Sequence, residues 1–200
     1  MGIKQLNTFL KQTCNNQIKK LTFNDIANKK LAIDVSIYIY KYLQEKALIE
    51  NFYLMIQLFR KYNIIPVFVF DGKPPKEKYE IIDKRKKEKS IARETYDSLD
   101  KKIKYLEKNP SLRNQGLIFA LKKQMQEEYK KSVKITIRDV RRVKNLMNAL
   151  GVCYLEADGE ADVLCAQLVK NKMVYGCLSE DMDMFAYGCN KIYRDINIYS

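Results

Sequence analysis

The sequence predicts an α/β fold in which a mainly parallel central sheet is flanked by helices. Two observations support this class. Short apolar segments alternate along the chain with longer segments whose apolar residues recur at helical spacing. One apolar segment, residues 64–70, shows no polar alternation, as expected of a strand that is covered on both faces. Alternating strands and helices favour a parallel sheet with right-handed crossovers.

The segments that we expect to form strands are few and short. They lie at residues 30–36, 64–70, 152–155 and 173–178, and residues 192–193 are a candidate fifth strand. The helices of the same body are expected at residues 2–11, 37–48, 51–62, 138–150 and 160–170. Gly151 would end the fourth of these helices, and Asp158 or Gly159 would cap the fifth.

Residues 76–131 differ in character from the rest of the chain. Charged residues dominate there, apolar residues are sparse, and the sequence Asn-Pro-Ser at residues 109–111 breaks the helical pattern. We therefore expect two or more helices that project from the body of the fold as an insertion.

The chain is strongly basic, with 37 lysines and arginines against 24 aspartates and glutamates and a formal net charge of +13. This balance indicates nucleic acid or another anionic surface as the partner. A membrane is disfavoured, because the longest apolar run is far too short to span a bilayer and no signal peptide is recognisable. We expect an intracellular protein, either nuclear or cytoplasmic.

The residue types that are absent exclude several mechanisms. The chain contains no histidine, which excludes Ser-His-Asp and Cys-His catalysis, histidine-ligated zinc and a histidine general base. Its five cysteines form no Cys-x-x-Cys pair, as expected of free thiols in a reducing compartment. Carboxylates, lysines, tyrosines and water activated by a metal remain as candidates for the chemistry.

Acidic residues follow each of the four main expected strands. Asp34 and Asp71 follow the first two, acids cluster at residues 156–162 after the third, and Asp181 and Asp183 follow the fourth. The carboxyl ends of parallel strands meet at one edge, where such sheets bind their ligands. Because Mg²⁺ and Mn²⁺ prefer carboxylate and water oxygens, acids gathered there in a basic protein predict metal-assisted chemistry on a polyanion.

The spacing of these acids leaves alternatives open. Asp181 and Asp183 are two residues apart, so both side chains of an extended chain would point the same way and share a metal; a polar loop is the alternative. Glu160 and Asp162 would lie about 200° apart on a regular helix. Both could face one site only if the first turn is irregular or if one acts through a water. Complementing the helix dipole is the ordinary role of an acid there.

Three basic residues follow Asp71 at regular spacing. Lys78, Arg85 and Lys89 stand at i, i+7 and i+11, which would place them in a narrow stripe on one helix face. Such a stripe could hold phosphate and help to place a scissile bond near metal. A solvated helix face is the alternative interpretation.

Tyr38, Tyr40 and Tyr42 could stack on nucleic acid bases. The chain contains 14 tyrosines, so packing in the core or at its rim is the expected role of two of these three.

Five sequence segments, taken together and in this order, resemble the flap endonuclease and XPG family of structure-specific nucleases. They are Met-Gly-Ile-Lys at residues 1–4, Leu-Ala-Ile-Asp-Val-Ser at 31–36, Val-Phe-Val-Phe-Asp-Gly-Lys-Pro-Pro at 67–75, Gly-Glu-Ala-Asp at 159–162 and Ser-Glu-Asp-Met-Asp at 179–183. The resemblance implies a PIN-like, 5′-nuclease fold with a helical arch, and it covers nearly the whole chain except residues 91–131.

The resemblance also implies a role for each matching residue. Lys78 and Arg85 would engage the scissile phosphate, Tyr40 would stack on a base, and Gly2 would lie near the active site after removal of the first methionine. Lys89, from the stripe, is a further expected DNA contact. Two divalent ions, Mg²⁺ with Mn²⁺ as a substitute, would be held directly or through water by six carboxylates: Asp34, Asp71, Glu160, Asp162, Asp181 and Asp183.

The resemblance divides the chain, expected to be one truncated α/β nuclease domain, into an N-terminal region at residues 1–105, an arch insertion at 76–131 and an internal region at 135–200. Family members continue into a further carboxylate-bearing segment and a helical element that grips duplex DNA, neither of which residues 1–200 contain. We therefore expect this chain to bind DNA but to cleave it poorly. A sliding clamp would be contacted through a downstream segment.

The function that these expectations support is metal-dependent cleavage of branched DNA, with removal of 5′ flaps in replication or repair as the main candidate. Within the same class, a 5′–3′ exonuclease or a PIN-like ribonuclease is the alternative. From a different class, the chain could be a remnant that binds nucleic acid without cutting it.

Overall fold

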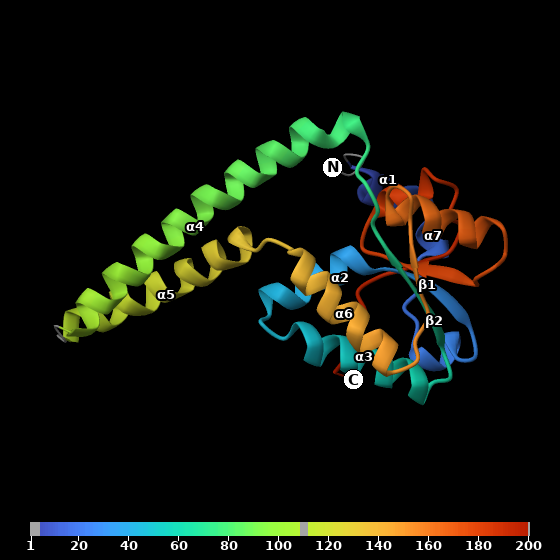
Figure 1. The fold of residues 1–200 in the computed structure, drawn as a ribbon, viewed down its shortest axis with the longest axis horizontal. Helices are drawn as coiled ribbons and strands as arrows, with labels where there is room; N and C mark the ends of the chain where they lie inside the picture. Colours follow the sequence, from blue (N-terminus) through green and yellow to red (C-terminus); the bar gives the residue numbers. More distant parts are fainter. Residues whose placement is uncertain (1–4, 109–111, 200) are drawn as a thin grey trace. The chain divides into compact units, whose positions relative to one another are not determined.

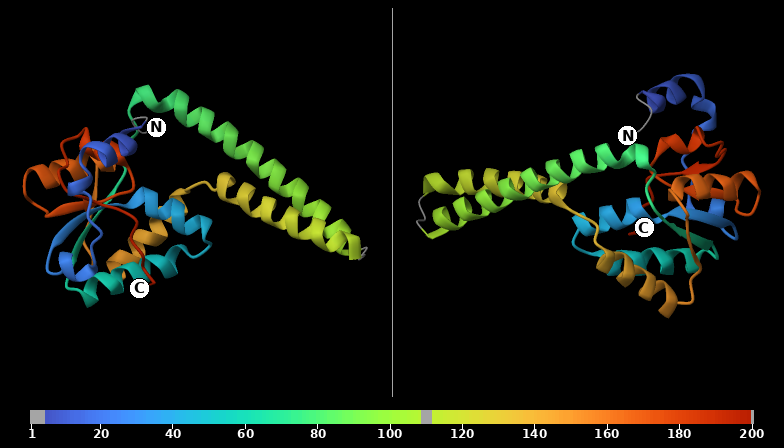
Figure 2. Two further views of the ribbon diagram at one scale, coloured as in Figure 1. Left: turned by 180° about the vertical axis from the view of Figure 1, so that it is seen from behind. Right: turned by 45° about the horizontal axis from the view of Figure 1, so that its top comes forward.

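The computed structural model describes residues 5–108 and 112–199, without the side chains of residues 112–114. The chain forms two compact units, which Figures 1 and 2 trace in sequence colours. Unit 1 comprises residues 1–74 and 137–200, and unit 2 comprises residues 75–136. Gly2, an expected DNA contact, lies outside the described residues.

The centre of unit 1 is a sheet of five strands in the order β3-β2-β1-β4-β5. Every neighbouring pair is parallel, so the predicted α/β class with a parallel sheet is confirmed. The strands are β1 (Lys30–Asp34), β2 (Ile65–Phe70), β3 (Tyr154–Glu156), β4 (Gly176–Leu178) and β5 (Ile192–Tyr193).

Helices cover both faces of this sheet (Figures 1 and 2). One apolar core joins the sheet to α2 (Val35–Gln44), α3 (Leu48–Lys61) and α6 (Ile137–Ala149). A second core joins the other face to α7 (Ala161–Lys170). The remaining helices of unit 1 are α1 (Leu6–Thr13), η1 (Asn15–Gln17), η2 (Phe23–Ile26) and η4 (Met182–Phe185).

The two faces of β1 differ in side-chain size. Leu31 and Ile33 face the core with α2 and α3, which contains buried tyrosines and phenylalanines. Ala32 faces the core with α7, which is built largely from alanine, valine and cysteine. Side chains alternate along a strand, so Asp34 falls on the same face as Ala32. The small-residue face therefore carries this acid.

Two predicted strands start too early, and one extends too far. The expected strand at residues 173–178 is limited to β4, because Lys172 and Met173 still close α7 by donating backbone hydrogen bonds to Val169 and Leu168 (3.0 Å each). The expected strand at 152–155 is β3, two residues later. β1 ends at Asp34, because its side chain accepts a hydrogen bond from the backbone N–H of Ser36 and begins α2 there.

Unit 2 is a pair of long helices, α4 (Tyr79–Lys108) and α5 (Leu112–Ser132), preceded by the short 3₁₀ helix η3 (Lys76–Lys78). Lys122 forms an ion pair with Glu107 (2.8 Å), and the rings of Tyr96 and Tyr129 lie 5.9 Å apart, so the helices are antiparallel. The predicted helical content of this segment is confirmed. No helix among the described residues is long and apolar enough to cross a membrane.

Gly72 joins the end of β2 to the loop before α7. Its backbone N–H donates to the carbonyl oxygen of Gly159 (2.7 Å), and the two segments approach closely. A Cβ atom at Gly72 would lie 1.9 Å from the carbonyl oxygen of Ala157, which is backbone and cannot rotate away. This contact explains why a glycine follows Asp71.

We predict that Gly72→Ala lowers the free energy of unfolding by about 2–3 kcal/mol, because the backbone must shift to admit the methyl group. Urea or thermal unfolding measures the loss. Gly159→Ala is the control: a Cβ there has no heavy atom within 4 Å, so its effect should stay within about 0.5 kcal/mol. Equal stability of both variants would contradict the close packing of these two segments.

Candidate functional site

Asp34 is the most buried of the candidate acids, with 6% of its surface exposed. It ends β1 and faces the α7 side of the sheet. One carboxylate oxygen, Oδ1, accepts a hydrogen bond from the backbone N–H of Ser36 (3.2 Å). The other, Oδ2, accepts one from the hydroxyl of Ser179 (3.3 Å). Both oxygens are therefore held in fixed directions.

Asp71 follows β2, the neighbour of β1, and is exposed. Its Oδ1 accepts a hydrogen bond from the backbone N–H of Ala161, the first residue of α7 (2.8 Å). Its Oδ2 accepts one from the hydroxyl of Ser36. Ser36 thus joins the carboxylates of Asp34 and Asp71 through its backbone and its side chain.

The start of α7 resolves the difficulty with Glu160 and Asp162. The cap is Glu160 itself, not Asp158 or Gly159 as predicted, and its backbone is extended (φ −85°, ψ 139°). The separation of about 200° expected on a regular helix therefore does not apply to this pair. Asp162 lies in the first turn of α7, where its carboxylate accepts a hydrogen bond from the backbone N–H of Val163 (2.7 Å).

Asp181 and Asp183 do not lie on an extended segment, so the prediction that an extended backbone points both side chains the same way is wrong. Asp181 caps η4, and Asp183 lies inside that 3₁₀ helix. Asp181 Oδ1 accepts a hydrogen bond from the backbone N–H of Asp183 (2.8 Å), so a local capping interaction orients it. The backbone N–H of Asp181 donates in turn to the hydroxyl of Ser179 (3.1 Å), which links this loop to Asp34.

Electrostatics shows that three of the acids lie close together. Burial, and after it the charges of Asp71 and Asp162, raises the pKa of Asp34 to about 7, although hydrogen bonds from Ser179 and Ser36 oppose this shift. No lysine or arginine among the described residues forms an ion pair with Asp34. A cation bound beside Asp34 would therefore stabilise its charge.

The donor chemistry of the cluster suits a divalent cation, since it consists of carboxylate and hydroxyl oxygens. Its geometry is more open than direct coordination requires. Among residues 5–108 and 112–199, apart from the side chains of 112–114, no group of three or more His, Cys, Asp and Glu is arranged to hold a metal ion. The fit to Mg²⁺ therefore rests on the donor set, part of which would reach the ion through its bound waters.

The candidate basic residues belong to unit 2. Lys78 ends η3 and precedes α4, so the predicted stripe is not on one continuous helix; Arg85 and Lys89 lie one turn apart on α4. Burial lowers the pKa of the half-buried Lys89, and the charges of Arg85 and Lys134 lower it further. Lys89, Arg85 and Lys134 therefore form a cluster of cations that a phosphate would stabilise.

The three tyrosines separate as expected. Tyr38 and Tyr42 are fully buried in the core beneath β1, and their rings lie 5.9 Å apart. Tyr40 is half-buried and is the one member of the run that reaches the surface. Its contact with a base stays a prediction.

Sequence reasoning missed Ser36, Ser179 and Lys134. The two serines stand two residues away from Asp34 and Asp181, a spacing at which a serine on a turn can reach the neighbouring carboxylate or amide. Their hydroxyls link acids from β1, β2 and the loop after β4. Lys134 follows α5, and no local pattern relates it to Lys89.

Comparison with known proteins gives consistent matches. Residues 1–92 match the XPG N-terminal domain, and residues 151–200 match the XPG I-region. The chain is 30% identical over 230 residues to a probable RAD2-like endonuclease, 369L, of Invertebrate iridescent virus 6, covering 96% of this chain and 55% of that protein. It is 30% identical over 213 residues to flap endonuclease 1 of Encephalitozoon cuniculi, covering 98% and 56%. The chain spans little more than half the length of these curated relatives.

Solved structures show the same fold. The catalytic core of Rad2 in complex with DNA substrate is similar with a TM-score of 0.64 and 23% identity, covering 99% of this chain and 51% of that chain. Human GEN1 in complex with Holliday junction DNA gives 0.62 and 20%, covering 98% and 41%. Flap endonuclease-1 from Methanococcus jannaschii gives 0.53 and 22%, covering 88% and 56%. The fold is therefore that of a 5′ nuclease.

The buried charge of Asp34 should lower the stability of the protein by a measurable amount. In the absence of divalent cation, Asp34→Asn should raise the free energy of unfolding at pH 8 by roughly 1–3 kcal/mol, because a buried charge beside Asp71 and Asp162 disappears. An asparagine amide can still accept from Ser36 and donate to Ser179. Chemical unfolding in a chelator measures the change.

Asp158→Asn is the control for this experiment, because Asp158 is an exposed acid of the loop before α7. Its substitution should leave stability within about 0.5 kcal/mol. Destabilisation by Asp34→Asn would show that the protein itself compensates the charge of Asp34 without a bound cation.

Proposed function

Since the chain belongs to the flap endonuclease and XPG family of nucleases, we propose that it hydrolyses phosphodiester bonds in branched DNA, with removal of 5′ flaps as its main reaction. The observation that carries this proposal is the carboxylate cluster around buried Asp34, at the carboxyl edge of a parallel sheet in a chain of net charge +13. Acids gathered in a basic protein suit a metal-assisted reaction on a polyanion.

The residues that would hold two divalent ions are the acids at the ends of the strands and at the start of α7. Mg²⁺ keeps several of its waters, so an open arrangement of carboxylates can hold it through water as well as directly. Bound ions would supply an activated water and stabilise charge on the leaving oxygen. The proposed ligands are Asp34, Asp71, Glu160, Asp162, Asp181 and Asp183.

The chain's own hydrogen bonds would orient these carboxylates before substrate arrives. Ser36 and Ser179 direct the oxygens of Asp34, and the first N–H of α7 directs Asp71. Positioning of this kind reduces the reorganisation that the reaction requires. The supporting residues thus contribute to rate without touching the substrate.

The cations of unit 2 would bind the phosphates of the substrate. In this proposal Lys78 and Arg85 engage the scissile phosphate, and Lys89 with Lys134 holds a neighbouring one. Burial, and after it the charges of Arg85 and Lys134, lowers the pKa of Lys89, and a phosphate bound beside these three cations would stabilise their charge. Tyr40 would stack on a base, and Gly2 would lie near the reacting phosphate.

Other substrates fit the same site. A 5′–3′ exonuclease or a PIN-like ribonuclease would use the same acids, and contact with a sliding clamp would use a downstream segment. From a different class, a domain that binds nucleic acid without cutting it is the alternative. Metal-dependent cleavage of a labelled flap, compared with a matched hairpin, separates these functions.

We predict that Asp181→Ala reduces cleavage of a flap in Mg²⁺ by at least a hundredfold and leaves the dissociation constant for DNA within a few-fold. The physical reason is that a metal ligand contributes more to the transition state than to ground-state binding. Single-turnover rates and fluorescence anisotropy measure the two quantities. Asp158→Ala is the control, and an unchanged rate for Asp181→Ala at saturating substrate would refute the assignment.

Arg85→Ala and Lys78→Ala should each lower the single-turnover rate by about tenfold or more, with a smaller rise in the dissociation constant. Lys86→Ala is a matched control on α4, because Lys86 already forms an ion pair with Asp83 (3.1 Å). If the two test variants only weaken binding and reduce its salt dependence, these residues are general phosphate contacts and their catalytic role is wrong.

A further inference from the structure

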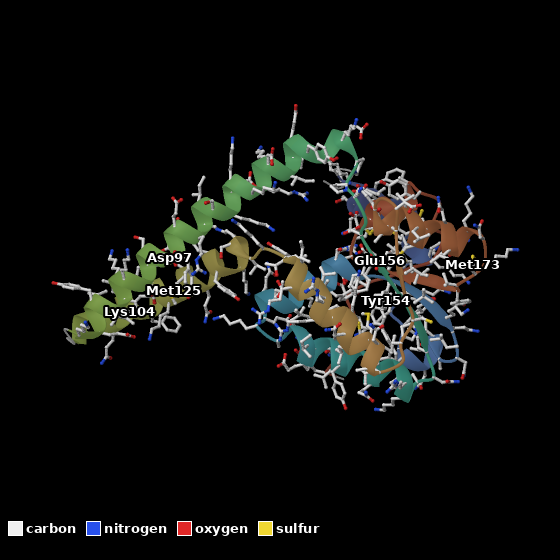
Figure 3. All side chains as sticks on the ribbon, viewed as in Figure 1. Asp97, Lys104, Met125, Tyr154, Glu156 and Met173 are labelled. Carbon is white, nitrogen blue, oxygen red and sulfur yellow. The ribbon has the colours of Figure 1, made fainter. Side chains whose placement is uncertain are left out.

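The amino-terminal edge of the sheet in unit 1, opposite the acids, is lined by lysines. Two of them stand at the start of β1, one before β5, one in the turn before β4, and two at the ends of α3 and α7. Figure 3 labels Met173 in that turn and Glu156 at the carboxyl end of β3. We name this group the amino-edge cluster: Lys29, Lys30, Lys61, Lys170, Lys172 and Lys191.

The composition of this edge differs from that of the chain as a whole. The segments that form it, residues 27–31, 60–66, 169–176 and 189–193, contain no aspartate or glutamate. The complete chain has 24 acids against 37 basic residues, so four segments that together hold six lysines and no acid are not an average sample of it. The edge therefore carries a strong local positive potential.

Two of these lysines make cation–π contacts with one tyrosine ring. The ammonium nitrogen of Lys191 lies 3.8 Å from the centroid of the Tyr175 ring, and that of Lys29 lies 4.9 Å from it. The backbone N–H of Tyr175 donates to the carbonyl oxygen of Lys30 (2.7 Å), which ties the third lysine to the same place. Attraction to the ring offsets part of the repulsion between the ammonium groups.

The cluster forms no ion pair with a carboxylate of the described residues. Among the residues that the structure describes, none of the six lysines takes part in an ion pair. Lys104 and Lys131 of unit 2, by contrast, pair with Asp100 (2.7 Å) and Glu128 (2.6 Å). The lysines of the cluster are thus available to an external anion.

Helix dipoles account for only part of this group. Lys61 and Lys170 lie in the last turns of α3 and α7, where a cation is favourable on general grounds. Lys172 has no such explanation, because it adopts a left-handed backbone conformation (φ 57°) after α7, where glycine is the favoured residue. A lysine thus occupies a position that disfavours residues with a Cβ atom.

We propose that the amino-edge cluster binds the phosphate backbone of nucleic acid, at a second contact surface remote from the carboxylate cluster. β1 has five residues, so the two edges lie roughly 16 Å apart along this strand. The ring of Tyr175 is engaged by ammonium groups, so the surface contacts phosphates and does not stack bases. It would bind a part of the substrate that does not react.

The test is the salt dependence of DNA binding by the whole chain. A variant with Lys30→Gln, Lys172→Gln and Lys191→Gln removes three charges, and its affinity for a fluorescent flap DNA is measured by anisotropy in a chelator between about 50 and 200 mM salt. Each lost phosphate contact should reduce the slope of log K against log salt by about 0.7–0.9. We therefore expect a slope smaller by roughly 2–3 units and binding at least tenfold weaker at the lower salt.

Two control variants distinguish an effect of these particular lysines from an effect of total net charge, and a third distinguishes it from an effect on stability. Lys86→Gln, Lys104→Gln and Lys131→Gln remove the same number of charges from lysines that already pair with acids, so binding should change little. A variant with Lys30→Arg, Lys172→Arg and Lys191→Arg keeps the three charges and should bind DNA as the wild type does. Lys172→Gly alone should raise the melting temperature and yet weaken DNA binding, two opposite changes that a structural role cannot produce.

Several outcomes would overturn this proposal. Equal slopes for wild type and the neutralised variant would show that these lysines do not contact phosphate. Cluster-dependent binding of polyglutamate, without cluster-dependent binding of DNA, would identify an acidic protein as the partner instead. Because binding is measured without divalent cation, a chain that never cleaves DNA would refute the proposed function and leave this inference standing.

Discussion

The main constraint on the structure is the unfavourable placement of carboxylates at the carboxyl edge of the sheet, which the surrounding groups must offset. Asp34 is buried, lies beside Asp71 and Asp162, and has no ion pair with any described residue. Burying a charge without a partner is costly, and a protein retains such a site when an external group compensates it. The small residues on the α7 face allow the helix to approach β1 and β2, so the first N–H of α7 reaches Asp71. The close packing of α7 therefore places a hydrogen-bond donor beside the carboxylates.

Apolar patterning predicted the fold because its signal is local. The uninterrupted apolar run at residues 64–70 and the alternation of segments place β2 and most helices correctly within a few residues. The boundaries of β3 and β4 could not be read in this way. They depend on which residues of a neighbouring strand offer partners, and on a left-handed residue, Lys172, that extends the turn after α7. These features depend on tertiary contacts, which a local sequence pattern does not reveal.

The candidate site was predicted in its parts but not in its connections. An acid that directly follows an apolar strand can be recognised in the sequence, so the positions of Asp34, Asp71 and Asp181 could be predicted. The hydrogen bonds that orient them do not, since Ser36 and Ser179 act across strands that are distant in the chain. The extended geometry assumed for Asp181 and Asp183 is wrong because a side-chain cap competes with extended backbone there. Spacing alone could not reveal that competition.

The parallel sheet itself sorts charge between its two edges. Helices that connect parallel strands run back against them, so their N-termini lie at the carboxyl edge and their C-termini at the amino edge. Dipoles then favour acids at the first edge and lysines at the second. Dipoles account for Asp34, which caps the N-terminus of α2, but not for Lys191, which precedes β5 and ends no helix. The topology of the sheet therefore sets the sign of the charge at each edge. The acidic edge attracts cations, and the basic edge attracts phosphates.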